Sequence, residues 1–232
     1  MGIDETTARA AVVAAGRRLG SRGLISAGEG NITVRLGEDR LATTPTGRRK
    51  DDLAVADVLV VPVADDGAAS DGSSPRPSTD LPIHRAIYAV RPDVGAVVHA
   101  HLPAAMALTL AGEVPDPAAL PETALLLPKL PFVPYGSPGS EELAGRVAAA
   151  FAAGEPPYPG AVLLERHGAV AVGATVDEAV NRLELVEVLC RTWRDALLIR
   201  HAVARDGPRA ILPAPGSGPG ASARERGRRS RQ

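Results

Sequence analysis

Hydrophobic and polar positions follow two different periods along this chain. Apolar residues at helical spacing predict helices over residues 4–22, 81–90, 104–111, 140–151 and 177–197. Runs rich in β-branched residues predict strands, some ending in turns, over residues 31–35, 40–47, 53–63, 94–98, 130–136, 161–165 and 169–173. Asp4, Ser140 and Asp177 stand where N-caps of three of these helices are expected. No internal repeat interrupts this succession of helices and strands.

The length and composition are typical of one domain followed by a tail. With 232 residues, of which 45% are hydrophobic, the chain can bury one sizeable core. We expect this domain to cover residues 1–205. Residues 206–232 are rich in Gly, Pro, Ser and Arg, and we expect them to form a disordered tail with no assigned role.

Charge and cysteine content exclude several classes of partner and site. The formal net charge is -1, and residues 202–232 carry seven Arg against Asp206 and Glu225, so they contribute +5 and the rest of the chain -6. A body of negative charge gives no electrostatic case for a nucleic-acid partner. The single cysteine, Cys190, excludes an internal disulfide and every cysteine-based zinc motif, which fits a reducing compartment. Any metal must therefore be held by His, Asp or Glu.

The hydropathy of the chain predicts no membrane partner. No apolar run approaches the roughly 20 residues that a spanning helix needs, and the N-terminus lacks the layout of a signal peptide. Aromatic residues make up 3% of the chain, so stacking platforms for bases or sugars are not expected to dominate recognition. We expect a soluble cytoplasmic protein.

Three histidines are candidates for a metal site. His99 and His101 follow a buried strand at positions i and i+2, so both side chains point to the same face. His167 follows another predicted strand. Three imidazoles with an open fourth position suit a catalytic zinc or a similar divalent ion. The alternative is that His99 and His101 are a pair of edge-strand histidines without chemistry. His84, on one face of the predicted helix over 81–90, is expected to be a core histidine bonded to the backbone and not a ligand.

Three segments rich in glycine or hydroxyl groups are candidates for anion binding. They contain Gly30 with Asn31, Thr46 with Gly47, and Ser78 with Thr79 ahead of Asp80. Glycine lets backbone amides approach an anion closely, and a helix N-terminus favours negative charge. Turns and helix caps use the same residues. Taken alone, the segment with Thr46 and Gly47 is equally well explained as a turn, and the other two are better explained as a turn and a helix cap.

Five motifs follow one another along the chain. They are Gly-Asn-Ile-Thr at 30–33, Thr-Pro-Thr-Gly at 44–47, Pro-Ser-Thr-Asp-Leu-Pro-Ile-His at 77–84, Ile-Tyr followed by Arg-Pro-Asp-Val-Gly-Ala-Val-Val-His-Ala-His within 87–101, and Glu-Arg-His-Gly at 165–168. Their order resembles the class II aldolase/adducin family, whose members include fuculose-phosphate aldolases and ribulose-phosphate 4-epimerases. The resemblance covers roughly residues 8–200. Five motifs in one order are far more specific than any one of them.

The resemblance implies a fold, an assembly and roles for these residues. It implies a three-layer α/β/α sandwich with a mostly antiparallel central sheet, assembled as a homotetramer with active sites between subunits. By resemblance, the metal, Zn2+ or another divalent ion such as Mn2+, Co2+ or Fe2+, is held by His99, His101 and His167. The phosphate of a small phosphorylated sugar is bound by Gly30, Asn31, Thr46, Gly47, Ser78 and Thr79. The acid/base carboxylate falls on Asp80.

Two positions depart from the family pattern. Aldolases usually have Glu where this chain has Asp80; the epimerases have Asp there, next to the metal. The epimerases also carry a longer insertion before the third histidine and a distal C-terminal tyrosine, whereas no tyrosine follows Tyr158 here. Aldolases use a tyrosine from a neighbouring subunit, and its expected register falls on Phe132. Tyr135 is the nearby phenol and our candidate proton donor.

We expect a metal-dependent aldolase that cleaves a small ketose 1-phosphate, of the fuculose or 5-deoxyribulose type, to dihydroxyacetone phosphate and an aldehyde. A Schiff-base mechanism is unattractive because the only lysines are Lys50, in a charged turn, and Lys129, between prolines. A 4-epimerase, a dehydratase of a methylthio-sugar phosphate and a decarboxylase of a keto-acid phosphate are alternatives on the same site. A scaffold of the adducin type without a metal and an iron oxygenase-like use of the site are two further alternatives.

Overall fold

The computed structural model describes residues 3–64 and 75–206. The predicted tail, apart from Asp206, lies outside the described residues, and the domain boundary after residue 205 stays a prediction. The chain divides into two units, Met1–Arg194 and Asp195–Gln232, and the sheet and the candidate site belong to the first. Among the described helices, none is long and apolar enough to cross a membrane.

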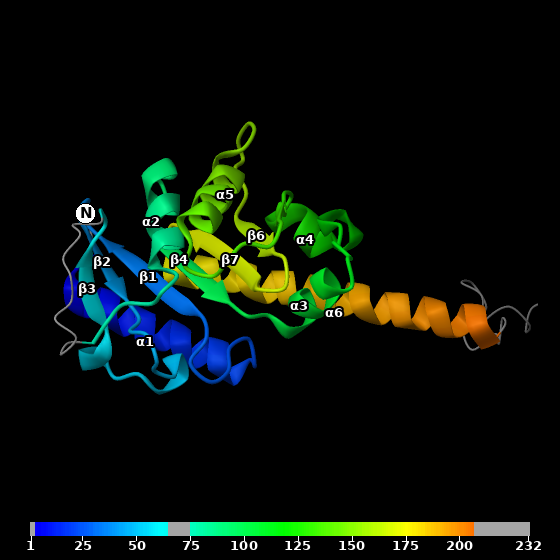
Figure 1. Cartoon of the computed structure of the whole chain (residues 1–232), viewed down its shortest axis with the longest axis horizontal. Helices are drawn as coiled ribbons and strands as arrows, with labels where there is room; N and C mark the ends of the chain where they lie inside the picture. Colours follow the sequence, from blue (N-terminus) through cyan, green and yellow to red (C-terminus); the bar gives the residue numbers. More distant parts are fainter. Residues whose placement is uncertain (1–2, 65–74, 207–232) are drawn as a thin grey trace, which may run out of the picture. The chain divides into compact units, whose positions relative to one another are not determined.

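Within residues 3–64 and 75–206, seven strands form one sheet in the order β3-β2-β1-β4-β7-β6-β5 (Figure 1). The strands are β1 Asn31–Leu36, β2 Arg40–Thr43, β3 Leu59–Pro62, β4 Ala96–Ala100, β5 Phe132–Val133, β6 Ala161–Leu164 and β7 Gly168–Gly173. The sheet is mixed, because β5 runs parallel to β6 and the other neighbouring pairs are antiparallel. Strand β4 lies at the centre between β1 and β7, so it is buried along its whole length.

Helices cover both faces of this sheet, which confirms the expected three-layer α/β/α fold (Figure 1). The helices are α1 Glu5–Ser21, α2 Leu81–Val90, α3 Pro103–Leu110, α4 Pro121–Leu126, α5 Glu141–Ala152 and α6 Val176–Asp206. Helices α2 and α5 pack against each other and share one apolar core with the sheet, which includes Ile87, Val97, Phe151, Val162 and Val170. Helix α1 packs on β1 and β2, and Arg18 of α1 binds Glu184 of α6.

Two of the three predicted helix caps are confirmed. Asp4 Oδ1 accepts a hydrogen bond from the Thr7 amide at 3.1 Å, and Ser140 Oγ accepts one from the Leu143 amide at 3.2 Å. The prediction for Asp177 is wrong, because α6 begins at Val176 and Asp177 lies within its first turn. The hydroxyl of Thr175 supplies the acceptor instead, for the amide of Glu178.

The predicted buried strand over residues 53–63 is correct only in its second half. Short 3-10 helices occupy Lys50–Asp52 and Val55–Asp57, and β3 begins at Leu59. The carboxylate of Asp57 accepts a hydrogen bond from the Ala54 amide at 2.9 Å, which favours a turn over an extended backbone. Strand β3 is half-buried because it is the edge strand of the sheet.

Candidate metal centre

The three candidate histidines meet where the end of β4 lies beside the start of β7. His99 belongs to β4, His101 follows that strand, and His167 directly precedes β7. These two strands are antiparallel, with Ala100 opposite Ala169, so residues far apart in sequence become neighbours. The ring centroids are 4.7 to 5.0 Å apart, and one nitrogen from each ring lies within 4.8 Å of the others. The three side chains could therefore hold one metal ion.

The close approach of the two strands depends on Gly168. Its φ is 103°, and a Cβ atom at this position would lie 2.2 Å from the carbonyl oxygen of Ala100 and 2.8 Å from Cα of His101. The preceding Arg166 also has a positive φ of 57°. This unusual backbone turns the chain sharply after β6 and presents His167 to the other two rings.

The hydrogen bonding of His99 fits a metal ligand. Its Nδ1 lies 3.0 Å from the carbonyl oxygen of Ala169. Because a carbonyl can only accept, Nδ1 carries the proton and Nε2 presents a lone pair. This Nε2 and Nδ1 of His167 are both buried, and neither has a hydrogen-bond partner in the part of the chain that the structure describes. Buried polar atoms without partners are costly, and a divalent cation would satisfy both nitrogens at once.

Burial keeps the three rings neutral, as metal ligation requires. The pKa of His99 is held well below its ordinary value, first by desolvation and then by the neighbouring His167 and His101. Desolvation also lowers the pKa of His101 and of His167. Neutral imidazoles have free lone pairs, so these nitrogens do not have to lose a proton before they bind a metal.

Asp80 lies next to the histidines and does not act as the helix cap that it resembles in sequence. Its side chain makes no capping bond to α2. Instead, Oδ1 accepts a hydrogen bond from the Gly139 amide at 3.0 Å and Oδ2 accepts one from Nδ2 of Asn31 at 3.3 Å. Oδ2 is also 3.9 Å from Nε2 of His99. The carboxylate is thus buried and lies beside the candidate metal centre.

The candidate anion-binding segments lie close together around Asp80. Gly30 precedes β1 with a φ of 72°, and a Cβ there would be 2.9 Å from the carbonyl oxygen of His99. An isolated β-bridge between Pro45 and Pro77 brings the segment with Thr46 and Gly47 beside the segment with Ser78 and Thr79. The amide of Thr46 is already bonded to the carbonyl of Arg76, at 2.8 Å.

Lys50 has a different environment from the charged turn that its sequence neighbours predict. The residue is buried, and its Nζ donates to the carbonyl oxygens of Gly28 at 2.6 Å and Arg48 at 2.9 Å. Desolvation lowers its pKa, and the carboxylate of Glu29 partly offsets this. Lys50 therefore ties two candidate binding segments together, a role that only long-range contacts reveal.

The two aromatic candidates lie on and beside β5. Phe132 and Tyr135 are both exposed, by 37% and 49%. The Tyr135 amide donates to Oε2 of Glu165 at 2.9 Å, and the guanidinium of Arg166 stacks 4.4 Å from the centroid of its ring. Tyr135 is thereby held beside the turn that carries His167.

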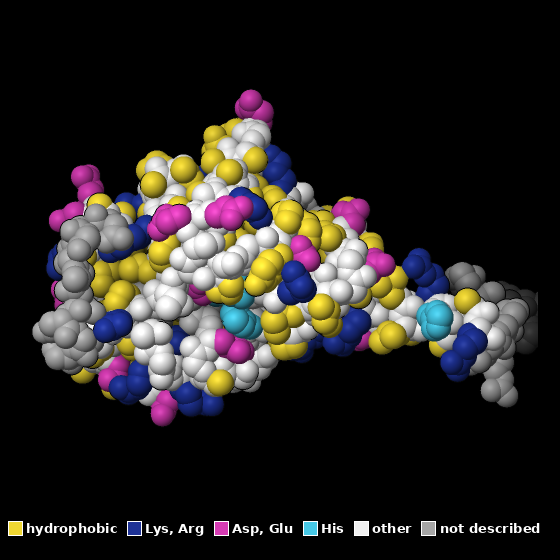
Figure 2. All heavy atoms as spheres, in the orientation of Figure 1, with side chains coloured by type: hydrophobic (Ala, Val, Ile, Leu, Met, Phe, Trp, Pro, Cys, Tyr) yellow, Lys and Arg dark blue, Asp and Glu magenta, His cyan; other side chains and the backbone are white. Residues whose placement is uncertain are grey.

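Histidine side chains reach the surface beside acidic side chains on the face shown in Figure 2.

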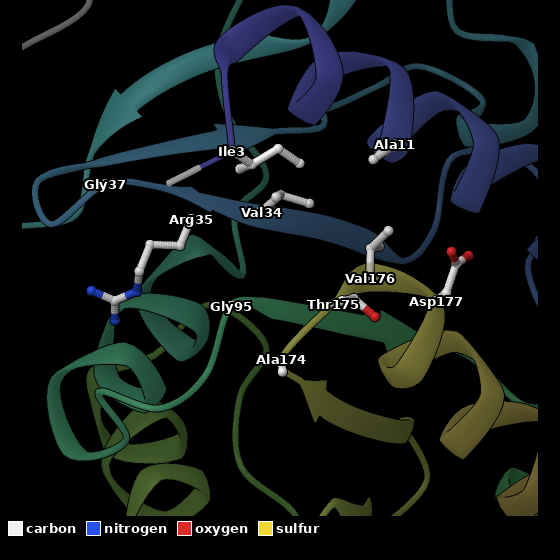
Figure 3. A pocket seen from close by; sticks show the side chains of 10 residues that line it. All are labelled: Ile3, Ala11, Val34, Arg35, Gly37, Gly95, Ala174, Thr175, Val176 and Asp177. Carbon is white, nitrogen blue, oxygen red and sulfur yellow. The ribbon is translucent and has the colours of Figure 1, made fainter. Parts of the chain in front are cut away.

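A separate cavity of about 450 Å³ lies at the end of β1 that is farther from the histidines, beside α1 and the start of α6 (Figure 3). Its lining includes Val34, Arg35, Val176 and Asp177. These side chains offer no cluster of metal ligands, so the histidine cluster is the better candidate for chemistry.

Residues 10–194 match the family model for the class II aldolase and adducin N-terminal domain. The chain belongs to this family. A 3-oxo-tetronate 4-phosphate decarboxylase from Cupriavidus necator is 36% identical over 82% of this chain and 84% of its own length. A methylthioribulose-1-phosphate dehydratase from Acidiphilium cryptum is 35% identical over 77% of this chain and 85% of its own.

Aldolases are also among the family members similar to this chain. A 5-methylthioribulose-1-phosphate/5-deoxyribulose-1-phosphate aldolase from Rhodospirillum rubrum is 32% identical over 80% of both proteins. The crystal structure of L-fuculose-1-phosphate aldolase from Thermus thermophilus superimposes with a TM-score of 0.69 at 28% identity, covering 87% of this chain and 97% of that one. The class II aldolase fold is thus shown, and the similar enzymes carry out more than one reaction.

Proposed function

We propose that this chain is a metal-dependent lyase of small phosphorylated sugars, with retro-aldol cleavage of a ketose 1-phosphate as its reaction. The products would be dihydroxyacetone phosphate and an aldehyde. One observation carries the proposal: three neutral imidazoles converge, with Nε2 of His99 buried and unpartnered, while the carboxylate of Asp80 lies 3.9 Å from that nitrogen. A metal site with an acid/base group beside it suits the cleavage of a bond near a carbonyl.

The residues around the histidines would share the work of binding and proton transfer. When bound, a divalent metal acts as a Lewis acid that polarises the substrate carbonyl and stabilises the negative charge that develops on its oxygen. Asp80 would accept the proton of the hydroxyl group next to the bond that breaks. Its carboxylate is suited to this role because the hydrogen bonds from Asn31 and the Gly139 amide hold it in place beside the metal centre.

The phosphate would be bound by the segments that surround Asp80. Their contributions are the side chain of Asn31, the hydroxyls of Thr46, Ser78 and Thr79, and the backbone of Gly30 and Gly47. Binding energy from the phosphate, which does not react, can position the sugar for bond cleavage. Oδ1 of Asn31 is buried without a partner, which leaves an acceptor available to a substrate hydroxyl.

Tyr135 is our proposed proton donor to the leaving group. The cation of Arg166 lies over its ring at 4.4 Å, and the phenol is 49% exposed, so it is accessible to a substrate. The proposal also takes zinc as the metal and a cytoplasmic homotetramer as the working form, both by resemblance to the family.

A second candidate reaction is decarboxylation of a 3-oxo-acid phosphate. It is favoured by the 36% identity to the decarboxylase from Cupriavidus necator. Loss of carbon dioxide from such an acid and cleavage of an aldol both place negative charge next to a carbonyl, so the same metal centre would serve either reaction. Dehydration of methylthioribulose 1-phosphate is favoured in the same way by the 35% identity to the dehydratase.

A substrate panel separates these reactions. The purified protein, loaded with zinc, is incubated with fuculose 1-phosphate, 5-deoxyribulose 1-phosphate, 5-methylthioribulose 1-phosphate and 3-oxo-tetronate 4-phosphate. Dihydroxyacetone phosphate, carbon dioxide and the dehydrated diketone are measured separately. We expect dihydroxyacetone phosphate to form from a ketose 1-phosphate. Its formation should stop when the metal is removed with a chelator. If no aldehyde forms from any substrate, the aldolase proposal is wrong. Carbon dioxide as the product would then support the decarboxylase, and the diketone would support the dehydratase.

A further inference from the structure

Glu29 is an acidic residue beside the candidate metal centre to which the proposed function assigns no role. Its Oε2 lies 3.7 Å from Nδ1 of His101. Both side chains are half-buried, with 28% of Glu29 and 25% of His101 exposed. We propose that Glu29 is a positioning residue for the metal centre, which orients the ring of His101 and keeps the proton on its Nδ1.

The carboxylate of Glu29 is held in place from its other side. Oε1 accepts hydrogen bonds from the amide and from the hydroxyl of Ser26, each at 2.8 Å. The amide of Glu29 donates to the carbonyl of Ser26 at 3.2 Å, which closes the turn. Two bonds thus restrict the side chain and a third restricts its backbone, and Oε2 is left facing His101.

The backbone that carries Glu29 is anchored on both sides. The carbonyl of Gly28 accepts a hydrogen bond from the buried Nζ of Lys50 at 2.6 Å. On the other side, Gly30 packs so tightly that a Cβ would be 2.9 Å from the carbonyl oxygen of His99. The turn therefore cannot move away from the histidines without breaking these contacts, so the position of Glu29 is a property of the fold.

The arrangement places an acceptor beside the same ring atom in both histidines, at 3.7 Å from Nδ1 of His101 and at 3.0 Å from Nδ1 of His99. Nδ1 of His99 faces the carbonyl oxygen of Ala169, and Nδ1 of His101 faces a carboxylate. A group that accepts the Nδ1 proton fixes the tautomer in which Nε2 carries the lone pair. A carboxylate also increases the electron density on the ring, so it strengthens the bond from the imidazole to a cation.

Metal affinity tests this inference without any substrate. The dissociation constant for zinc is measured by competition with a chromophoric chelator on the full chain and on Glu29→Gln, which keeps a hydrogen-bond acceptor for Ser26 but removes the charge. We expect zinc to bind about 10- to 100-fold more weakly to this variant. Ser26→Ala removes one bond to Oε1 and is expected to weaken binding less than Glu29→Gln does.

The control removes an acidic side chain at the other end of β1. Glu38 is exposed in the turn after that strand, so Glu38→Gln should bind zinc as the unmodified protein does. Cobalt substitution gives a second readout, because a changed ligand field at His101 alters the visible absorption bands of Co2+. We expect altered bands in Glu29→Gln, unaltered bands in Glu38→Gln, and the same melting temperature for both metal-free variants.

The inference rests on the proposed function only in needing a metal at the histidines. If the unmodified protein binds no divalent metal, the proposed function and this inference fail together. If it binds zinc and Glu29→Gln binds it equally tightly, the inference alone is overturned. The same holds if Glu29→Gln changes only the substrate KM, because Glu29 would then act on the neighbouring binding segment and not through His101.

Discussion

Nδ2 of Asn31 donates a hydrogen bond to Oδ2 of Asp80 over 3.3 Å, across a separation of 49 residues. The contact joins the first residue of β1 to the residue that precedes α2. Asn31 is also paired in register with His99 across β1 and β4. One asparagine therefore links the candidate acid/base group to a candidate metal ligand, and the position of each depends on the others.

Replacement of Asp80 by Asn tests the acid/base role. The amide keeps the size of the side chain but cannot take up a proton. For a substrate that the unmodified protein converts, we therefore expect kcat to fall by about 100-fold or more. Zinc affinity and melting temperature are measured alongside and should change little. The matched control is Asp177→Asn, whose carboxylate is 82% exposed. Turnover of Asp80→Asn at the original rate would remove Asp80 from the mechanism.

Gly168→Ala should destabilise the protein and disturb the metal centre. The new Cβ would collide with the carbonyl of Ala100, at a φ of 103° that alanine rarely adopts. We expect a loss of at least about 1–3 kcal/mol in the free energy of unfolding, and weaker zinc binding. Gly145→Ala is the control, because a Cβ there meets no atom within 4 Å and α5 gains about 0.5–1 kcal/mol. Denaturant unfolding of both variants measures the contrast, and equal stabilities would contradict it.

Lys50→Met should loosen the two chain segments that the Lys50 side chain holds together, at Gly28 and at Arg48. The variant loses two hydrogen bonds from a charged donor to the partly buried carbonyls of Gly28 and Arg48, and such bonds contribute about 1.5–3 kcal/mol each. We expect a lower melting temperature and a raised KM for a phosphorylated substrate. Lys129→Met is the control, because Lys129 bonds one carbonyl, that of Glu155, in another part of the chain. A similar small effect in both variants would show that burial of Lys50 is unimportant.

His84 should make the stability of the protein depend on pH. Burial lowers its pKa to about 3, whereas an unfolded histidine titrates near 6.5. Between these values the unfolded chain binds the additional proton, so the free energy of unfolding falls as the pH falls, and is fully retained above about 6.5. Burial lowers the pKa of the candidate ligand His99 in the same direction. The contribution of His84 is therefore obtained by comparing the pH dependence of unfolding in the unmodified protein with that in a variant without His84.

His84→Asn isolates that contribution. Its amide can replace the contact between Nδ1 of His84 and Oγ1 of Thr33, which are 2.8 Å apart. From pH 6 to pH 4, the unmodified protein should lose about 1.4 kcal/mol per pH unit more than the variant does. Chemical unfolding at several pH values measures both slopes, with the exposed His201→Asn as the control. Parallel slopes for all three proteins would show that His84 is protonated in the folded state.

The sequence alone determined the elements whose pattern is local. Helix α1 with its cap at Asp4 and helix α5 with its cap at Ser140 were predictable because apolar spacing and capping chemistry act over a few residues. A pair of histidines in the candidate metal centre was also identifiable, since His99 and His101 stand at i and i+2 directly after an apolar run that predicts a strand, and so share a face. The five motifs in order identified the family without any knowledge of their contacts.

Only the tertiary structure decided which polar residues act together. Asp80 has the sequence signature of a helix cap, but its carboxylate binds Asn31 and the Gly139 amide. Lys50 stands in a run of charged residues, yet its ammonium group is buried against two carbonyls. Nothing in the sequence around Glu29 indicates a role at the histidines. Its side chain lies beside His101 only because β1, which follows Glu29, pairs with β4, which precedes His101. Each of these roles depends on a contact between segments far apart in the chain, which hydrophobic periodicity does not encode.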